Sequence, residues 1–173
     1  MGKTDLAIYV SKAAAMCDPV MNHQLIDQFP FLLPRNVWTG GISSTYDYTY
    51  TELDAMPDGW RKAFGWNFIN DLKAAIIDDF GEEGLTKVLI TDIKEKWGFL
   101  HVYMTDGPAI NEIITKYEEL SRWHCIKCGK PARWISCSWI SPWCDDCAEC
   151  GRICELYVPI EEWMRERKIK LLS

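Results

Sequence analysis

Cysteine placement constrains this chain more than any other feature of its sequence. Seven of the eight cysteines fall within the 30 residues from Cys125 to Cys154, and only Cys17 lies outside that segment. A disulfide-rich secreted protein would spread its cysteines and carry a signal peptide, whereas the first residues here include an early acid and no apolar run of signal length. We therefore expect reduced thiolates in a cytoplasmic protein, and such a density of thiolates predicts a metal site.

The cysteine spacing predicts a zinc site with four thiolate ligands. Cys125 and Cys128 form one C-x-x-C pair, followed by Gly129, and Cys144 and Cys147 form a second pair after 15 intervening residues. Two residues between cysteines let both sulfurs reach one ion, and paired C-x-x-C segments at this separation are typical of tetrahedral zinc. Because four protein ligands leave no position open for water or substrate, we expect structural Zn²⁺.

Two other ligand sets are compatible with the spacing. Cys147 and Cys150 also form a C-x-x-C pair followed by glycine, so Cys150 could replace Cys144. Four cysteines have the spacing of a bacterial iron–sulfur redox protein, namely Cys144, Cys147, Cys150 and Cys154. That cluster would leave the first pair without a role. The remaining Cys17 and Cys137 are expected to be ordinary small apolar side chains.

Hydrophobic periodicity predicts a small α+β domain before the cysteines. After short helices in the first 35 residues, the first ended at Asp18-Pro19, apolar residues recur at helical spacing from Phe68 to Phe80. Apolar and β-branched runs at 88–93 and 99–104 flank a short turn and predict a β-hairpin. A second helix should begin at Pro108. The predicted fold is thus a helix–β-hairpin–helix domain with a four-cysteine, zinc-ribbon-like C-terminal lobe.

Charge and composition both change at His124. Residues 1–123 contain 11 basic and 18 acidic side chains, whereas residues 124–173 contain 8 and 7 and are rich in cysteine and tryptophan. We therefore predict an α+β domain over 1–123 and a Cys/Trp-rich zinc-binding lobe and tail over 124–173. The net charge of −6 disfavours binding to a phosphate backbone and favours a basic protein partner. The sequence contains no run of 18 apolar residues, so we predict no membrane span.

Aromatic and acidic residues before the first long helix are candidates for a partner-binding surface. They are Tyr46, Asp47, Tyr48, Tyr50, Glu52 and Asp54. Protein interfaces use this composition, although the same alternation is compatible with a strand that places one tyrosine face on the core, or with an exposed loop.

Nucleic acid is the alternative partner. Four tryptophans and three basic residues near the cysteines could stack on and clamp single strands, namely Trp123, Trp134, Trp139, Trp143, Lys127, Lys130 and Arg133. We favour apolar packing of these rings, because the basic cluster is small and the protein is acidic.

No familiar catalytic motif occurs in the sequence. It contains no nucleophile elbow, P-loop, dinucleotide fingerprint or H-E-x-x-H. A zinc deaminase needs H-x-E, and none of His23, His101 and His124 has a glutamate two positions later. We therefore expect a protein that is not an enzyme. A pocket that sequesters a small anionic signal molecule remains an alternative function.

Three motifs occur in a fixed order between residues 57 and 148. They are Gly59-Trp60, the hairpin from Asp92 to Tyr103, and the cysteine pairs in C-I-K-C-G-K-P and W-C-D-D-C-A. Together they resemble a group of small bacteriophage and prophage proteins, mostly of unknown function, that share a V-K-E-K-F-G-x-L-R-F-Y hairpin and a C-x-x-C-G knuckle closed by C-x-x-H or C-x-x-C. Here His101 replaces the hairpin arginine and Cys147 the common last histidine.

The resemblance implies Cys144 rather than Cys150 as a ligand, and it implies a viral context. Combined with the charge, it leads us to expect a phage-encoded, zinc-stabilised acidic protein in the cytoplasm of the host cell. That protein would bind and modulate or inhibit a host macromolecule, for example a defence or nucleic-acid enzyme.

Overall fold

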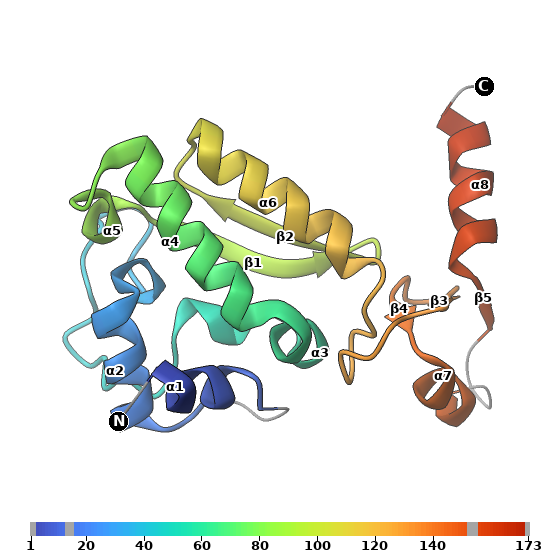
Figure 1. Cartoon of the computed structure of the whole chain (residues 1–173), viewed down its shortest axis with the longest axis horizontal. Helices are drawn as coiled ribbons and strands as arrows, with labels where there is room; N and C mark the ends of the chain where they lie inside the picture. The colour runs from blue at the N-terminus through green and yellow to red at the C-terminus, as the bar shows by residue number, and fades with distance from the viewer. Residues whose placement is uncertain (1–2, 13–15, 152–155, 172–173) are drawn as a thin grey trace.

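The computed structural model describes residues 3–12, 16–151 and 156–171. These residues form a mixture of helices and small antiparallel sheets, as the sequence predicts. Figure 1 shows a larger part, here called the body (residues 3–123), and a smaller part that carries the cysteines, here called the lobe (residues 124–171). Among the described residues, no helix is both long and apolar enough to cross a membrane.

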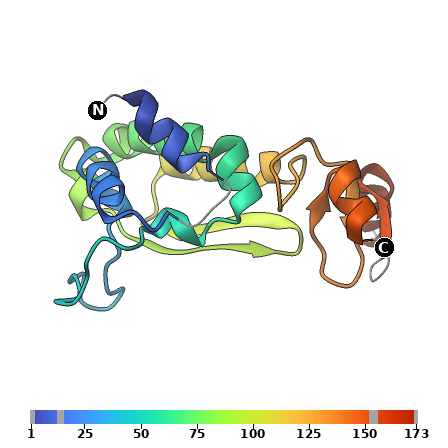
Figure 2. The same cartoon turned by 90° about the horizontal axis from the view of Figure 1, so that it is seen from below.

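Two helices and a hairpin build the centre of the body. Helix α4 (Trp66–Phe80) and helix α6 (Pro108–Ser121) lie on one face of strands β1 (Ile90–Lys96) and β2 (Phe99–Met104), as Figures 1 and 2 show. The apolar stripe predicted for α4 faces this core through Phe68, Ile69, Leu72, Ala75 and Ile76. Gly81 ends the helix with a φ of 70°, a conformation that glycine adopts without steric cost.

The hairpin turns over two residues. Trp97 and Gly98 have φ angles of 59° and 85°, and two positive values are the geometry that matches the twist of the flanking strands. Ile93 pairs with Val102 across the antiparallel ladder, and both side chains are buried. The hairpin therefore offers one apolar face to the helices.

A carboxylate on α4 holds the beginning of α6. Asp79 accepts hydrogen bonds from the backbone N–H groups of Ala109 and Ile110, both at 3.0 Å. These N–H groups belong to the first turn of α6 and have no partner within the helix. Asp79 therefore caps a helix whose first N–H partner follows 30 residues later in the chain.

The segments before α4 complete the same core, with the 3₁₀ turn at Glu52–Ala55 against β1. They are α1 (Lys3–Val10), α2 (Pro19–Gln28), the 3₁₀ turns η1 (Pro30–Leu32) and η2 (Glu52–Ala55), α3 (Asp58–Trp60) and the π-helical turn η3 (Arg61–Gly65). Asp18 caps α2 through Val20 N–H at 3.0 Å, so Asp18-Pro19 begins a helix and the first helix already ends at Val10. Helix α5 (Gly84–Lys87) follows α4.

The lobe has its own small sheet. Strands β4 (Pro142–Trp143), β3 (Trp134–Ser136) and β5 (Tyr157–Pro159) form an antiparallel sheet in the order β4-β3-β5. Helix α7 (Asp145–Gly151) follows β4, and α8 (Ile160–Leu171) ends the described chain. Only a few apolar side chains fill the centre of the lobe, chiefly Ala132, Ile135 and Ile160.

Body and lobe contact each other directly. The Gly59 N–H donates to the Ile126 carbonyl at 2.9 Å, and the Trp139 indole in the lobe donates to Glu95 on β1 at 3.0 Å. The boundary placed at His124 stays a prediction, and hydrogen bonds cross it at both the cysteine-bearing loop and the hairpin.

Candidate metal centre

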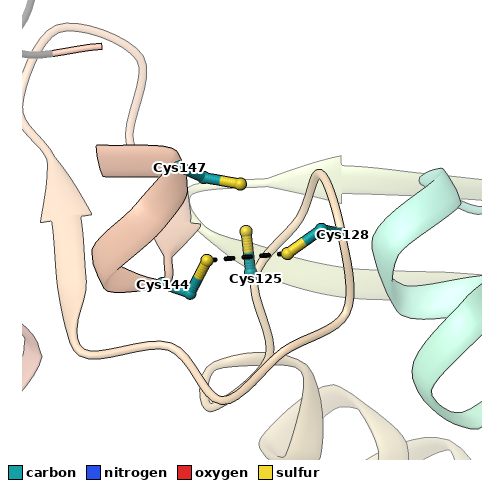
Figure 3. A group of neighbouring side chains, drawn as sticks. All are labelled: Cys125, Cys128, Cys144 and Cys147. Atoms are coloured by element: carbon teal, nitrogen blue, oxygen red, sulfur yellow. Dashed lines mark hydrogen bonds between the residues drawn. The ribbon is translucent and has the colours of Figure 1, made fainter. Parts of the chain in front are cut away.

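Four cysteine side chains converge between the body and α7. The sulfurs of Cys125, Cys128, Cys144 and Cys147 all lie within 4.8 Å of one another, and Figure 3 shows them pointing toward a common centre. The Cys128 and Cys144 sulfurs are 3.5 Å apart. A tetrahedral ion with Zn–S bonds of about 2.3 Å requires sulfurs separated by about 3.8 Å. These four residues are the predicted ligands, and their arrangement fits one metal ion.

The first pair lies on a tight loop between α6 and β3, here called the knuckle (Cys125–Gly129). Gly129 N–H donates to the Cys125 carbonyl at 2.9 Å, and the φ of Gly129 is 79°. A positive φ at this position turns the chain back, so that both sulfurs face the same point. Glycine after the second cysteine is thus required by the geometry of the loop.

The second pair is held by the junction between β4 and α7. Cys144 follows β4 directly, and its carbonyl accepts the Ala148 N–H at 2.9 Å. Cys147 lies in the first turn of α7. Residues three apart in a helix lie on one face, so Cys144 and Cys147 can reach the same ion.

The alternative ligand sets require Cys150 or Cys154, which are not among the four cysteines that converge within the described part of the chain. Cys150 is exposed and lies outside the group of four sulfurs. Cys154, which the iron–sulfur spacing also requires, lies outside the described residues. Cys17 and Cys137 are exposed, so our expectation that they act as ordinary apolar side chains is wrong as regards burial.

The donor set suits a soft divalent cation. Cys125 and Cys144 are buried, and Cys128 and Cys147 are half-buried. Burial, followed by hydrogen bonding with Cys144 and Cys128, raises the pKa of the Cys147 thiol. Four thiolates this close together repel one another unless a cation lies between them, and thiolate-rich tetrahedral sites select zinc or iron–sulfur centres.

Two basic residues of the lobe are already paired with acids. Lys130 Nζ lies 2.7 Å from Asp146, and Arg133 Nη1 lies 3.6 Å from Asp145. Hydrogen bonding to Asp146 raises the pKa of Lys130. Both carboxylates come from the first turn of α7. Two of the three basic side chains proposed to clamp nucleic acid therefore have adjacent counter-charges.

The knuckle docks on the body through a contact that the sequence did not reveal. A Cβ atom on Gly59 would lie 2.2 Å from the Cys125 carbonyl oxygen, and one on Gly129 would lie 2.5 Å from the Gly59 carbonyl oxygen. Two glycines thus allow the backbones of α3 and the knuckle to touch. The Gly59-Trp60 pair was the only clue, and its partner lies 66 residues later in the chain.

The histidines lie outside the metal centre. His124 Nδ1 is 3.0 Å from the Leu120 carbonyl, and its ring packs edge-on to Phe64. His101 is half-buried on the hairpin, with Nδ1 3.4 Å from Glu118. The cysteines alone therefore form the group that can hold a metal among the described residues.

The candidate partner residues lie in the segment from Asn36 to Asp54, which forms a loop followed by η2, so the tyrosine run is not a strand. Tyr46 and Tyr48 are half-buried against the core, and Asp54 accepts hydrogen bonds from Thr51 N–H and Met16 N–H. Asp47 and Tyr50 are exposed, whereas Glu52 and Asp54 are half-buried like the two other tyrosines. Two of the six candidate side chains are therefore exposed.

Comparison of the chain with protein-family models, with curated proteins and with solved structures finds no match.

Proposed function

We propose that this protein is a phage-encoded, non-catalytic binding protein of the host cytoplasm, with structural zinc at Cys125, Cys128, Cys144 and Cys147. It would bind and modulate a basic host protein through the loop from Asn36 to Tyr50. The donor chemistry supports the structural role, because four thiolates fill the tetrahedral positions of zinc and leave none for water or substrate. The viral context rests on the resemblance of residues 57–148 to phage proteins.

The exposure of Trp38 carries the proposal of a binding surface. Trp38, one of nine tryptophans in the chain, is 91% exposed. Tryptophan is among the residues that contribute most to binding energy at protein interfaces, and a solvated indole costs free energy until a partner covers it. Val37 and Ile42 on the same loop are also exposed.

The loop is ordered by its own hydrogen bonds. The Asn36 side chain accepts from Trp38 N–H at 2.9 Å and from Thr39 N–H at 3.0 Å, and Asn36 N–H donates to the Gly41 carbonyl at 2.9 Å. A loop that is fixed before binding loses less conformational entropy when the complex forms. Figure 2 shows this loop projecting from the end of the body far from the lobe. Partner and metal would therefore bind at separate places.

The charge of the body supports a basic partner. Residues 1–123 carry an excess of seven acidic side chains, a field that attracts basic protein surfaces and repels phosphate. A host enzyme that binds nucleic acid presents such a basic surface. The paired state of Lys130 and Arg133 also weakens the case for nucleic acid on the lobe.

Affinity capture from a lysate of the host bacterium, with zinc-loaded protein as bait, tests the proposal. We expect a basic protein to be retained by the wild type and lost with Trp38→Ala. The matched control is Trp97→Asn, which removes another exposed indole but keeps an Asn-Gly turn. Retention unaffected by Trp38→Ala, or tight single-stranded DNA binding that weakens with salt and disappears with Arg133→Ala, would contradict the proposal.

A further inference from the structure

A polar cavity lies where the loop meets η2. Its volume is about 620 Å³, and its walls include Arg35, Asn36, Thr39, Ser43, Tyr50 and Glu52. A single side chain of a partner protein fits within such a volume. The cavity lies on the proposed binding loop but is separate from the exposed Trp38 ring, which is not part of its wall.

Glu52 brings an uncompensated negative charge to this cavity. Its carboxylate is half-buried and has no hydrogen bond or ion pair within the described part of the chain. Burial, and then the nearby negative charge of Asp92, raise the pKa of Glu52. Asp92 itself is paired with Lys94, so that lysine does not serve Glu52. A carboxylate removed from water in this way is stabilised when a cation reaches it.

Tyr50 supplies a fixed aromatic surface beside the carboxylate. Tyr50 is 51% exposed, and its ring packs edge-on against Tyr46 with ring centroids 5.3 Å apart. The Tyr46 hydroxyl also donates to the Tyr50 carbonyl at 2.5 Å. A cation gains free energy over an exposed tyrosine face, and more when a carboxylate lies next to it.

Arg35, in the wall of the same cavity, favours a cation that belongs to a polypeptide over a free cation. Its Nη1 donates to the Thr86 carbonyl at 2.7 Å, which ties the guanidinium to α5. It has no carboxylate partner within the described residues, and its other N–H groups suit acceptor oxygens. A free cation would be repelled by Arg35, whereas a peptide chain brings carbonyl oxygens together with its basic side chain. The cavity therefore suits a basic residue within a polypeptide.

We infer that this cavity binds an arginine side chain of the partner protein, with the guanidinium against the Glu52 carboxylate and the Tyr50 ring. Arginine is favoured over lysine because its planar guanidinium pairs with a carboxylate through two hydrogen bonds, stacks on an aromatic ring and is less strongly hydrated. The inference deepens the proposed function and rests on it for the identity of the partner as a protein.

The test is a titration of the zinc-loaded full chain, labelled with ¹⁵N, with N-acetyl-L-arginine-N-methylamide. We expect saturable shifts of the Tyr50 and Glu52 amide resonances, and an affinity that falls by about tenfold in Glu52→Gln, as loss of a charge-assisted hydrogen bond implies. The matched control is Glu82→Gln, which removes an exposed carboxylate outside the cavity and should leave the affinity unchanged.

The absence of shifts at millimolar probe would overturn the inference. Equal affinity in wild type and Glu52→Gln, or equal affinity for the corresponding lysine derivative, would do the same. Tighter binding of free L-arginine than of the blocked derivative would also overturn it, because the occupant would then be a small molecule. None of these outcomes alters the Trp38-dependent capture of a partner, so failure here is distinguishable from failure of the proposed function.

Discussion

The indole Nε1 of Trp60 donates a hydrogen bond to the backbone carbonyl of His124 at 2.9 Å, across 64 residues of sequence. Trp60 is fully buried in the body, and His124 immediately precedes the first metal ligand. A buried indole N–H needs an acceptor, and here that acceptor belongs to the chain that carries Cys125. The core of the body therefore contributes to setting the position of the knuckle.

Substitution of single cysteines should show whether the second pair of zinc ligands is Cys144 with Cys147 or Cys147 with Cys150. We expect Cys144→Ser to lose zinc and Cys150→Ser to retain one zinc per chain, because only Cys144 has its sulfur in the convergent group. Elemental analysis of purified protein measures the stoichiometry. Iron with inorganic sulfide, or zinc lost from Cys150→Ser but not from Cys144→Ser, would refute the assignment.

Removal of zinc should loosen the lobe first. In the body, we expect amide protection to be lost where α3 contacts the knuckle. Metal binding contributes directly to folding where a small core cannot suffice, and the lobe buries only a few apolar residues. We expect the amide of Gly59 to lose protection together with that of Ile126, since Gly59 N–H bonds to the knuckle. The amides of the β1–β2 ladder should remain protected. Hydrogen exchange by NMR after chelation distinguishes this pattern from uniform unfolding, which would contradict it.

Gly59→Ala should destabilise the fold and weaken zinc retention together. The added methyl group would lie 2.2 Å from the Cys125 carbonyl oxygen, so that α3 and the knuckle must separate. Overpacking of this kind costs about 1–3 kcal/mol of unfolding free energy, and sometimes more.

Gly41→Ala is the matched control for this substitution. Its Cβ would meet only the Thr39 hydroxyl, at 3.3 Å, and we expect a change within about 0.5 kcal/mol. Urea denaturation and competition with a chelator measure the two effects. A variant Gly59→Ala with wild-type stability and zinc affinity would show that α3 and the knuckle are not in contact.

Asp71 should contribute stability that depends on pH. Hydrogen bonding from Lys116, at 2.6 Å, lowers the pKa of Asp71 below the usual range of an aspartate, and Tyr117 donates a second bond at 2.8 Å. The folded state therefore binds this proton less tightly than the unfolded state. The stabilisation is complete above the unfolded pKa and is lost as the pH falls through the lowered, folded pKa.

Paired variants isolate this contribution. Relative to Asp78→Asn on the same helix, Asp71→Asn should lower the unfolding free energy by about 0.5–1 kcal/mol near neutral pH, since the pair is partly exposed and screened. The difference should shrink below about pH 4, where Asp71 of the Asp78→Asn protein becomes protonated in the unfolded state, whereas the Asp71→Asn protein has no such carboxylate to take up a proton. A difference that stays constant down to pH 2 would contradict the role given to Asp71.

The regular parts of the fold follow from local patterns in the sequence. The stripe of α4, the two apolar runs of the hairpin and Pro108 at the first turn of α6 each encode an element through neighbouring residues. The cysteine spacing is equally local, and one of the ligand sets that it allowed is the group of four sulfurs that converge. Local patterns suffice where one element or one loop contains its own determinants.

Features that depend on distant partners could not be predicted in this way. The capping role of Asp79 is one such feature, because the N–H groups that donate to its carboxylate, at Ala109 and Ile110, lie in another helix. The burial of cysteines also depends on tertiary packing, which is why Cys17 and Cys137 are exposed against expectation. Nothing in the tyrosine run indicates which of its rings packs on the core and which remains open.

The docking of the knuckle on Gly59 has a consequence for synthesis of the chain. Ribosomes add about 5–20 residues per second, so the 66 residues between Gly59 and Cys125 take roughly 3–13 s to make. During that interval the nascent body has no knuckle against which Trp60 can close, and Cys144 and Cys147 are made later still. Binding of a metal by the four cysteines would therefore be a late event in biogenesis. Docking of the knuckle would cover an aromatic surface that newly made chains expose for seconds.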